Sequence, residues 1–471
     1  MPHTKNKHSF SITEGPILSS MIRYAFPIIC SSLLSLLYQS MDLFVLSCFS
    51  ATDAVASVGS TTSIVSLFLS ICSGLGAGIG ILFSKAFGKK DKEETHSLLS
   101  TAIVIALALG ITVAAAGIFT IRPLLILTNC PTECLRDATL YATVYILGSP
   151  FILLSSYSSS AISGSGNSRY LFFVSLISGG VNMTLNVIFA LILPRVVLAV
   201  ALATVCSTLL NAVLYLRFIT NPKGTICFSL RGMRFSFPVF RNILRYGLPA
   251  MFTLIVSPLV NMQIQSAINA HGADAIAGNT ACMQYENLIS YVALSLSGAA
   301  LTFMGQNIGA GKPDRVRRSF LYAMITSTAA CALLVLLIEI FARPLLSIYV
   351  GDSAAAVEYG VTRMRYVLFF YIFTSNPMNV AIRAFGHPQL ETGVNLSFSL
   401  GFRTLWMQCI YPAKKTIENL YLCFPITYFM TQICYACILI VLFRRYNKET
   451  KEMLSSAADT LNQKTTIGET P

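Results

Sequence analysis

Residues 21–46 read MIRYAFPIICSSLLSLLYQSMDLFVL, and this stretch decides the class of protein to which the chain belongs. It is long and apolar enough to cross a bilayer, which takes about 20 helical residues. It nevertheless carries Asp42 in its outer half, although an acid at the centre of a membrane helix costs about 2.5–3.5 kcal/mol on insertion scales. Ser35, Tyr38 and Gln39 precede Asp42 at spacings that share its helical face, which indicates a polar stripe rather than contact with lipid.

Two interpretations of Asp42 follow from its position. It is either a group that titrates along a pathway through the membrane or an acid close enough to the outer surface to be solvated. We favour the first interpretation, because ionisable residues inside membrane helices are by default functional.

The composition indicates a membrane protein over the whole chain. Of the 471 residues, 54% are hydrophobic and 11% are charged, and the mean hydropathy of +0.67 is too high for a soluble protein. The net charge is +13, but the basic residues lie in short loops and no nucleic-acid-binding motif is present, so we expect no nucleic-acid partner. The five histidines lack a Cys or an acid at metal-ligand spacing, so we expect neither a metal centre nor a cofactor.

Runs of about 20 apolar residues repeat along the chain and predict an all-α integral membrane protein. We expect twelve transmembrane helices in two six-helix bundles. The spans are predicted near residues 21–46, 55–83, 98–120, 138–162, 170–193, 196–219, 246–270, 276–304, 319–341, 361–384, 390–411 and 420–443. The predicted division is an N-terminal tail at 1–20, a bundle at 21–219, a linker at 220–245, a second bundle at 246–443 and a C-terminal tail at 444–471.

Five short motifs recur at offsets of 220–223 residues. Residues 23–27 (RYAFP) return as 245–249 (RYGLP), and residues 122–125 (RPLL) return as 343–346. Each unit holds an even number of spans, so both units enter the membrane in the same direction. The two bundles are therefore predicted to be related by a pseudo-two-fold axis along the membrane normal, with a central cleft between them and binding near the midplane.

The distribution of Lys and Arg predicts the orientation. If the N-terminus is cytoplasmic, most of the 33 basic residues fall in loops on that same side, as the positive-inside rule requires. We therefore expect a multi-pass monomer in the lipid bilayer of the cytoplasmic membrane, with both termini in the cytoplasm.

Several motifs give the chain a family likeness. Residues 14–16 (EGP), Asp42, residues 54–59 (AVASVG) and residues 305–312 (GQNIGAGK) together resemble the multidrug and toxic compound extrusion (MATE) family. The resemblance covers about residues 12–445 and is greatest to bacterial members, which have twelve spans. It implies a transporter rather than an enzyme. Members export mainly cationic, amphipathic compounds in exchange for protons or sodium ions.

The resemblance also implies a coupling site. In the family an acid in the first helix couples ion entry to substrate release, and here that position is Asp42. Some prokaryotic members build a cation site from this region with an Asn and an Asp four residues apart on the fifth helix and a Thr on the sixth; the matching positions are Asn182, Asn186 and Thr204. Because Asn186 replaces the second acid, sodium would be held weakly and the proton is the simpler coupling ion. The alternative for the two asparagines is hydrogen bonding between helices.

The second half carries its own polar groups inside predicted spans. Asn261, Gln265 and Asn269 follow each other at i, i+4 steps and form a polar face toward the cleft or a neighbouring helix. Glu286 is either a second titrating group or the partner of a buried base, for which Arg403 is the obvious candidate. The residues predicted to line the substrate cleft are Tyr38, Gln39, Asn261, Gln265 and Arg403.

We expect a secondary antiporter that exports organic cations by alternating access, with Asp42 as the main coupling carboxylate and Glu286 as a second. Protonation of Asp42 would remove the charge that holds a cation, and the difference in affinity between two access states would drive the cycle. The alternative is a flippase for a lipid-linked saccharide. It would need basic residues in the cleft, and we place only Arg403 within a span, which disfavours it. A membrane enzyme or a channel would need paired histidines and acids or a filter motif, which we do not find.

Overall fold

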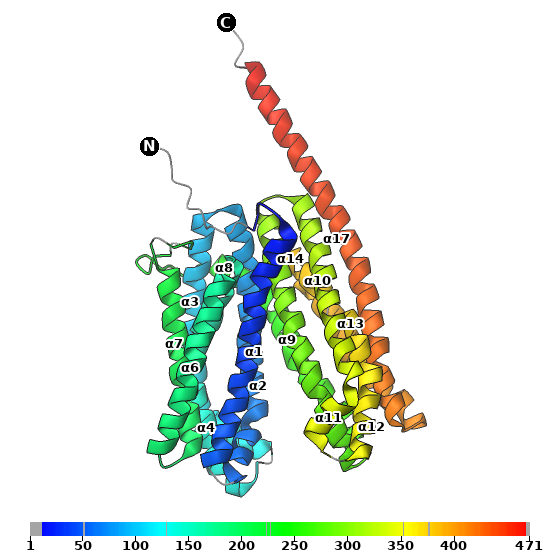
Figure 1. The fold of residues 1–471 in the computed structure, drawn as a ribbon. Coiled ribbons are helices and arrows are strands. Elements are labelled where there is room, and N and C mark those ends of the chain that lie inside the picture. Colours follow the sequence, from blue (N-terminus) through cyan, green and yellow to red (C-terminus); the bar gives the residue numbers. More distant parts are fainter. Residues whose placement is uncertain are drawn as a thin grey trace.

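The computed structural model describes residues 12–49, 52–128, 130–222, 224–226, 228–351, 353–374 and 377–467. Over these ranges the chain forms helices joined by short connections, without a strand. Figure 1 shows two helical bundles standing side by side. The predicted all-α membrane fold is confirmed.

The first bundle contains one span that is bent rather than straight. Helices α4 and α5 meet at an angle of 49°, and Gly148 lies between them. A Cβ atom on Gly148 would come within 2.7 Å of Val205 on α7, so a larger residue would force the bend away from α7. The helices are α1 (Ile17–Phe49), α2 (Thr52–Lys89), α3 (Lys92–Leu127), α4 (Thr132–Leu147), α5 (Ser149–Gly164), α6 (Ser168–Ile192) and α7 (Val196–Ile219).

The second bundle begins with three long helices, α8 (Phe237–Asn269), α9 (Ala273–Gly309) and α10 (Pro313–Ile340). Shorter pieces interrupted by π-helical turns follow, a kind of turn that is frequent at functional sites. These pieces are α11 (Ala342–Val350), α12 (Ala354–Arg363), η1 (Met364–Leu368), α13 (Phe369–Thr374), α14 (Met378–Ala384), α15 (Pro388–Asn395), η2 (Leu396–Phe402), α16 (Arg403–Leu405), η3 (Trp406–Ile410) and η4 (Tyr411–Ala413), before the last helix α17 (Ile417–Ile467).

The predicted spans all fall on helical segments. By length and composition, eight helices of the described ranges could cross a membrane, or nine with the bent pair of α4 and α5. The other three predicted spans, at 246–270, 361–384 and 390–411, fall on α8 and on the two interrupted runs α12–α14 and α15–η4. The sequence pattern did not predict the π-helical turns. An apolar run looks the same whether its residues form an α-helix or a π-helical turn.

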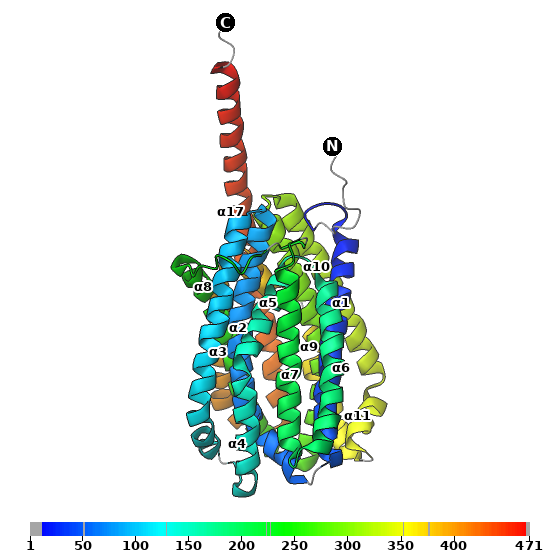
Figure 2. The same cartoon turned by 90° about the vertical axis from the view of Figure 1, so that its left-hand side faces the viewer.

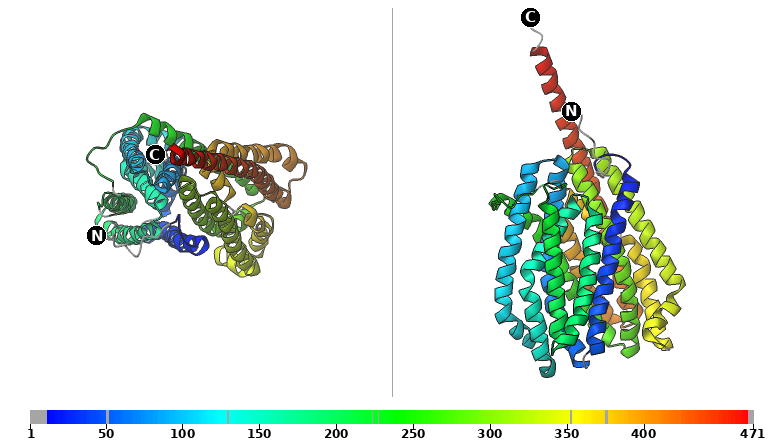
Figure 3. Two further views of the ribbon diagram at one scale, coloured as in Figure 1. Left: turned by 90° about the horizontal axis from the view of Figure 1, so that it is seen from above. Right: turned by 60° about the vertical axis from the view of Figure 1, so that its left-hand side comes forward.

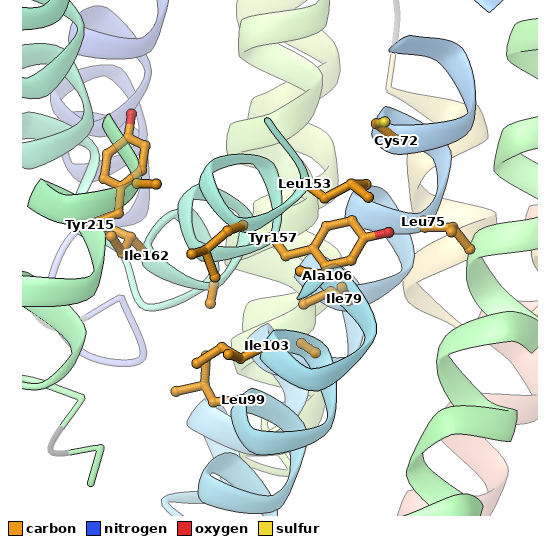
Figure 4. Packing of buried hydrophobic residues seen from close by; sticks show 14 of the residues in the cluster. Cys72, Leu75, Ile79, Leu99, Ile103, Ala106, Leu153, Tyr157, Ile162 and Tyr215 are labelled. Carbon is orange, nitrogen blue, oxygen red and sulfur yellow. The ribbon is translucent and has the colours of Figure 1, made fainter. Parts of the chain in front are cut away.

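Each half has its own apolar core. In the first half, Tyr157 on α5 points between α2 and α3 and lies near Ile79 and Ala106, all three of them buried (Figure 4). In the second half, Ile289 of α9 packs with Val335 of α10. Each bundle is therefore packed around a core of its own.

The two halves meet at the end of the molecule that carries both termini (Figures 1 and 3). There Tyr24 of α1 shares a 3.2 Å hydrogen bond with Thr302 of α9, and Gln306 of α9 donates a 2.7 Å hydrogen bond to the carbonyl of Gly164. Helix α2 approaches α9 so closely that a Cβ atom on Gly305 would overlap Ser84. A Cβ atom on Gly88 of α2 would likewise overlap the backbone of Gln306, so α2 and α9 are in close contact at this end.

Helix α17 continues well beyond the bundle, past the end that carries the N-terminus (Figures 1 and 2). The predicted polar tail at 444–471 is therefore helical as far as Ile467.

Candidate functional site

A polar cluster in the first half joins α1 to α6 and α7, which stand side by side in Figure 2. Asn186 on α6 donates a 2.5 Å hydrogen bond from Nδ2 to Oδ1 of Asp42 on α1. The same Nδ2 lies 3.3 Å from Oδ1 of Asn182. Asn182 in turn donates a 3.4 Å hydrogen bond to Oγ of Ser207 on α7. The carboxylate of Asp42 is thus the end of a hydrogen-bonded chain through three helices.

Helix geometry explains why these side chains meet. Asn182 and Asn186 are four residues apart and share one face of α6, and both are buried. Tyr38 and Asp42 are also four residues apart, on α1. The ring of Tyr38 lies where a Cβ atom of Gly179 would be, so the absence of a side chain at Gly179 lets α1 approach α6. One stripe of α1 therefore packs along one stripe of α6.

The cluster offers oxygen atoms to a small cation. Oδ1 of Asn186 is buried and has no hydrogen-bond partner among the described residues. Asp42 supplies the cluster's one negative charge. Hard cations take oxygen ligands of this kind, so the residues fit either a proton on Asp42 or a sodium ion held by Asp42 and Asn186.

A second polar cluster lies inside the other half. Arg363 of α12 donates to both carboxylate oxygens of Glu286 on α9, from Nε at 2.7 Å and from the second terminal nitrogen at 2.9 Å. Its remaining terminal nitrogen donates a 2.7 Å hydrogen bond to Asn279 Oδ1. The side chains of Arg363 and Glu286 are 5% and 14% exposed, so this is a buried, bidentate ion pair.

Arg403 lies on aromatic rings near this ion pair. Its guanidinium carbon is 4.4 Å from the ring centroid of Phe424 and 5.5 Å from that of Tyr428, both on α17. Arg363 approaches the same Phe424 ring at 5.4 Å. Among the described residues, Arg403 Nε is buried without a hydrogen-bond partner.

Comparison with known proteins now identifies the family. The family model described as MatE matches residues 27–188 and 249–404, one segment in each half. The chain belongs to the MATE family. Its members are multidrug efflux transporters of the membrane and not enzymes.

Individual relatives agree with this assignment. The chain is 26% identical over 348 residues to the probable multidrug resistance protein YoeA of Bacillus subtilis, covering 72% of this chain and 75% of YoeA. It is 24% identical over 355 residues to a FAD transporter of Shewanella oneidensis, covering 74% and 77% of the two chains. It also resembles a solved outward-facing multidrug resistance MATE transporter of the MOP superfamily, with a TM-score of 0.82 and 18% identity over 96% of this chain and all of the other.

Within this MATE transporter, the predicted first-half residues come together with one exception. Asp42, Asn182 and Asn186 are in contact, whereas the hydroxyl of Thr204 donates to the carbonyl of Val200 within α7, at 3.0 Å. Ser207, three residues after Thr204, takes the contact with Asn182. Sequence reasoning missed Ser207, although a second hydroxyl on the same face of the helix was a usable signal.

In the second half, Glu286 does pair with a buried base, one of its two predicted alternatives, but Arg403 was the wrong candidate for that base. Its partner is Arg363, and Arg403 lies on aromatic rings instead. Arg403 is also not the only base within a predicted span, because Arg363 and Arg383 lie in the span predicted at 361–384. Arg383 is paired with Glu391 at 2.9 Å. The reason given against a flippase, that basic residues are scarce in the spans, therefore does not hold.

The remaining predicted cleft residues have mixed outcomes. Gln265 connects to the ion-pair network, because its Oε1 accepts a 3.3 Å hydrogen bond from Asn279. Its Nε2 also donates a 2.9 Å hydrogen bond to Asn269. The side chains of Gln39 and Asn261 lie outside the part of the chain that the structure describes.

Proposed function

We propose that this MATE transporter is a secondary antiporter that exports amphipathic organic cations in exchange for protons, with sodium as the alternative coupling ion. The observation that carries the proposal is the 2.5 Å hydrogen bond from Asn186 to Asp42. It places the single carboxylate of the cluster on a contact between two helices, where a change in its charge acts on their packing.

Coupling follows from the two charge states of Asp42. Ionised Asp42 accepts the hydrogen bond from Asn186 and attracts a cationic substrate. Protonated Asp42 has lost that charge, so the affinity for a cation falls and the contact between α1 and α6 weakens. A ligand moves such an equilibrium only by its difference in affinity for the two states.

The proposed orientation puts both termini in the cytoplasm of a cytoplasmic-membrane protein. The end at which the halves meet would then be the cytoplasmic end, as the basic residues of the loops between α2 and α3 and between α9 and α10 favour. Alternating access would open this end while the opposite ends of the bundles approach each other. We propose that a monomer suffices, because each coupling cluster lies within one chain.

Purified protein in liposomes loaded with ethidium tests the proposal. A pH gradient and a sodium gradient are imposed separately on the wild type, on Asp42→Asn and on Asp137→Asn. Asp137 is the matched control, because it is an acid of the same half that pairs with Arg195 at 2.6 Å and is partly exposed. We expect ethidium release driven by the pH gradient, lost in Asp42→Asn and kept in Asp137→Asn.

The other outcomes separate the alternatives. Release driven only by sodium would make sodium the coupling ion. Release that persists in Asp42→Asn would contradict coupling through this carboxylate. If neither gradient moves ethidium, the exporter proposal fails and the flippase for a lipid-linked saccharide becomes the better candidate, since Arg363 and Arg403 supply buried bases in the spans.

A further inference from the structure

One buried cation inside the second bundle has no carboxylate partner among the described residues. Arg403 is only 8% exposed, and a guanidinium stays protonated at any physiological pH. Glu286, the predicted partner of Arg403, already accepts hydrogen bonds from Arg363 on both oxygens. Within the described ranges no carboxylate forms an ion pair with Arg403. The bundle therefore encloses one guanidinium without a protein counter-charge.

The aromatic contacts of Arg403 leave its hydrogen-bonding edge unused. Phe424 and Tyr428 lie against its guanidinium, and an aromatic ring attracts the positive charge without giving the N–H groups an oxygen acceptor. The N–H groups point along the plane, where they match the two oxygens of a carboxylate or a phosphate. Consistent with this, Nε of Arg403 is buried and has no hydrogen-bond partner among the described residues.

The surroundings suit an aromatic ligand. Tyr371 packs edge-on against Tyr428 with ring centroids 6.1 Å apart, and its hydroxyl is 2.6 Å from Ser290 Oγ. Tyr371 and Tyr428 both keep some exposed surface. Aromatic rings around a cation can stack on a flat ligand, while the cation binds an anionic group of the same ligand.

The position of Arg403 corresponds to the polar centre of the other half. At an offset of 221 residues, one of those at which the motifs recur, Arg403 takes the place of Asn182. The first half thus has the carboxylate of Asp42 bonded to this polar centre, and the second half has an unpaired guanidinium. The two halves differ in charge at related places.

We propose that Arg403 binds the anionic group, a carboxylate or a phosphate, of an aromatic amphipathic ligand. This inference rests on the proposed transport function only in naming the ligand a substrate; the binding itself requires no gradient and no coupling. The substrates would then include aromatic anions and zwitterions, with the flat body on Phe424 and Tyr428 and the anionic group on Arg403.

Binding to purified protein in phosphatidylcholine nanodiscs tests the proposal. Riboflavin and its monophosphate, FMN, are the probes, because both are fluorescent and they differ by a single phosphate. We expect the wild type to bind FMN at least tenfold more tightly than riboflavin. Arg403→Gln should abolish this preference and Arg403→Lys should keep part of it. Arg343→Gln removes an exposed arginine of the same half and should leave the preference unchanged.

Equal binding of the two flavins by the wild type, or a preference that survives in Arg403→Gln, would overturn the proposal. If Arg403→Gln does not fold, competition on the wild type decides: 1-naphthyl phosphate should displace FMN at least tenfold better than 1-naphthol, and equal displacement contradicts the site. Repeating the measurement in phosphatidylglycerol nanodiscs should preserve the preference. Its loss there would assign the site to a lipid phosphate instead. These binding measurements can be interpreted even if the protein does not export ethidium, because binding requires no gradient.

Discussion

The ring of Tyr38 on α1 occupies the place that a Cβ atom would take on Gly179 of α6. The two helices can come this close only because residue 179 has no side chain. Asp42, one turn further along α1, reaches Asn186 in consequence. The contact of the Asp42 carboxylate with Asn186 thus depends on a glycine that has no side chain of its own.

Gly179→Ala should therefore weaken the contact between Asp42 and Asn186, although residue 179 touches neither of them. The added methyl group overlaps the Tyr38 ring, and overpacking of this kind costs about 1–3 kcal/mol. We expect a lower melting temperature and slower ethidium transport, because α1 must move away and the contact between Asp42 and Asn186 lengthens. Gly180→Ala is the matched control, since a Cβ atom there meets nothing within 4 Å. Equal stability and transport in both variants would refute the close-approach argument.

The Glu286–Arg363 pair should matter for stability. Removing one partner of a buried ion pair leaves a buried charge and costs about 3–5 kcal/mol. Glu286→Gln and Arg363→Gln should each lower the melting temperature, and the double variant should lose less than the sum of the two. Arg343→Gln breaks the exposed pair with Glu358 and should cost at most about 1 kcal/mol. Additive losses in a thermal-unfolding series would show that the pair does not act as a unit.

A disulfide between α2 and α9, at the end where the two halves meet, should stop transport. The Cβ of Ser84 is 3.0 Å from the position a Cβ would take on Gly305, so a separation of the two helices by about 0.5 Å brings the pair into the range of a disulfide. In a cysteine-free background, Ser84→Cys with Gly305→Cys should crosslink α2 to α9 and block efflux until a reductant is added. Gly80→Cys with Ser160→Cys, whose Cβ atoms would lie 3.7 Å apart, links α2 to α5 within one half and should leave efflux intact. Full transport by the crosslinked Ser84–Gly305 variant would mean that this end does not open.

His387 should make stability depend on pH. It lies in the loop between α14 and α15, where burial and the positive charges of Arg445, Arg245 and Lys85 lower its pKa below the usual 6.5, with Glu449 acting in the opposite direction. The unfolded chain then binds the proton more readily, so stability should fall as the pH drops below about 6.5. His387→Gln should reduce this fall and leave stability at pH 8 unchanged. Thermal unfolding between pH 5 and 8 measures both.

Prediction of the candidate site succeeded where spacing along one helix carried the information. The prediction found Asp42 as an acid inside an apolar span, and the family resemblance added Asn182 and Asn186, whose four-residue spacing puts them on one face of α6. It failed where the answer depended on how a helix is rotated about its axis. Thr204 turns its hydroxyl to its own helix, and Ser207 makes the contact instead.

The sequence by itself determined that the chain is a helical membrane protein built from two related halves. Apolar segments of spanning length must satisfy their backbone hydrogen bonds internally, and in a bilayer a helix does so. The recurring motifs then showed that the second half repeats the first.

Only the tertiary structure decided which charges meet. Glu286 could pair with any base that a neighbouring helix brings near, and the π-helical turn η1 follows directly after the partner, Arg363. Because helix rotation and approach distance are set by packing between segments far apart in sequence, spacing could not distinguish Arg363 from Arg403. The same packing left Arg403 buried on aromatic rings, without a counter-charge from any residue that the structure describes.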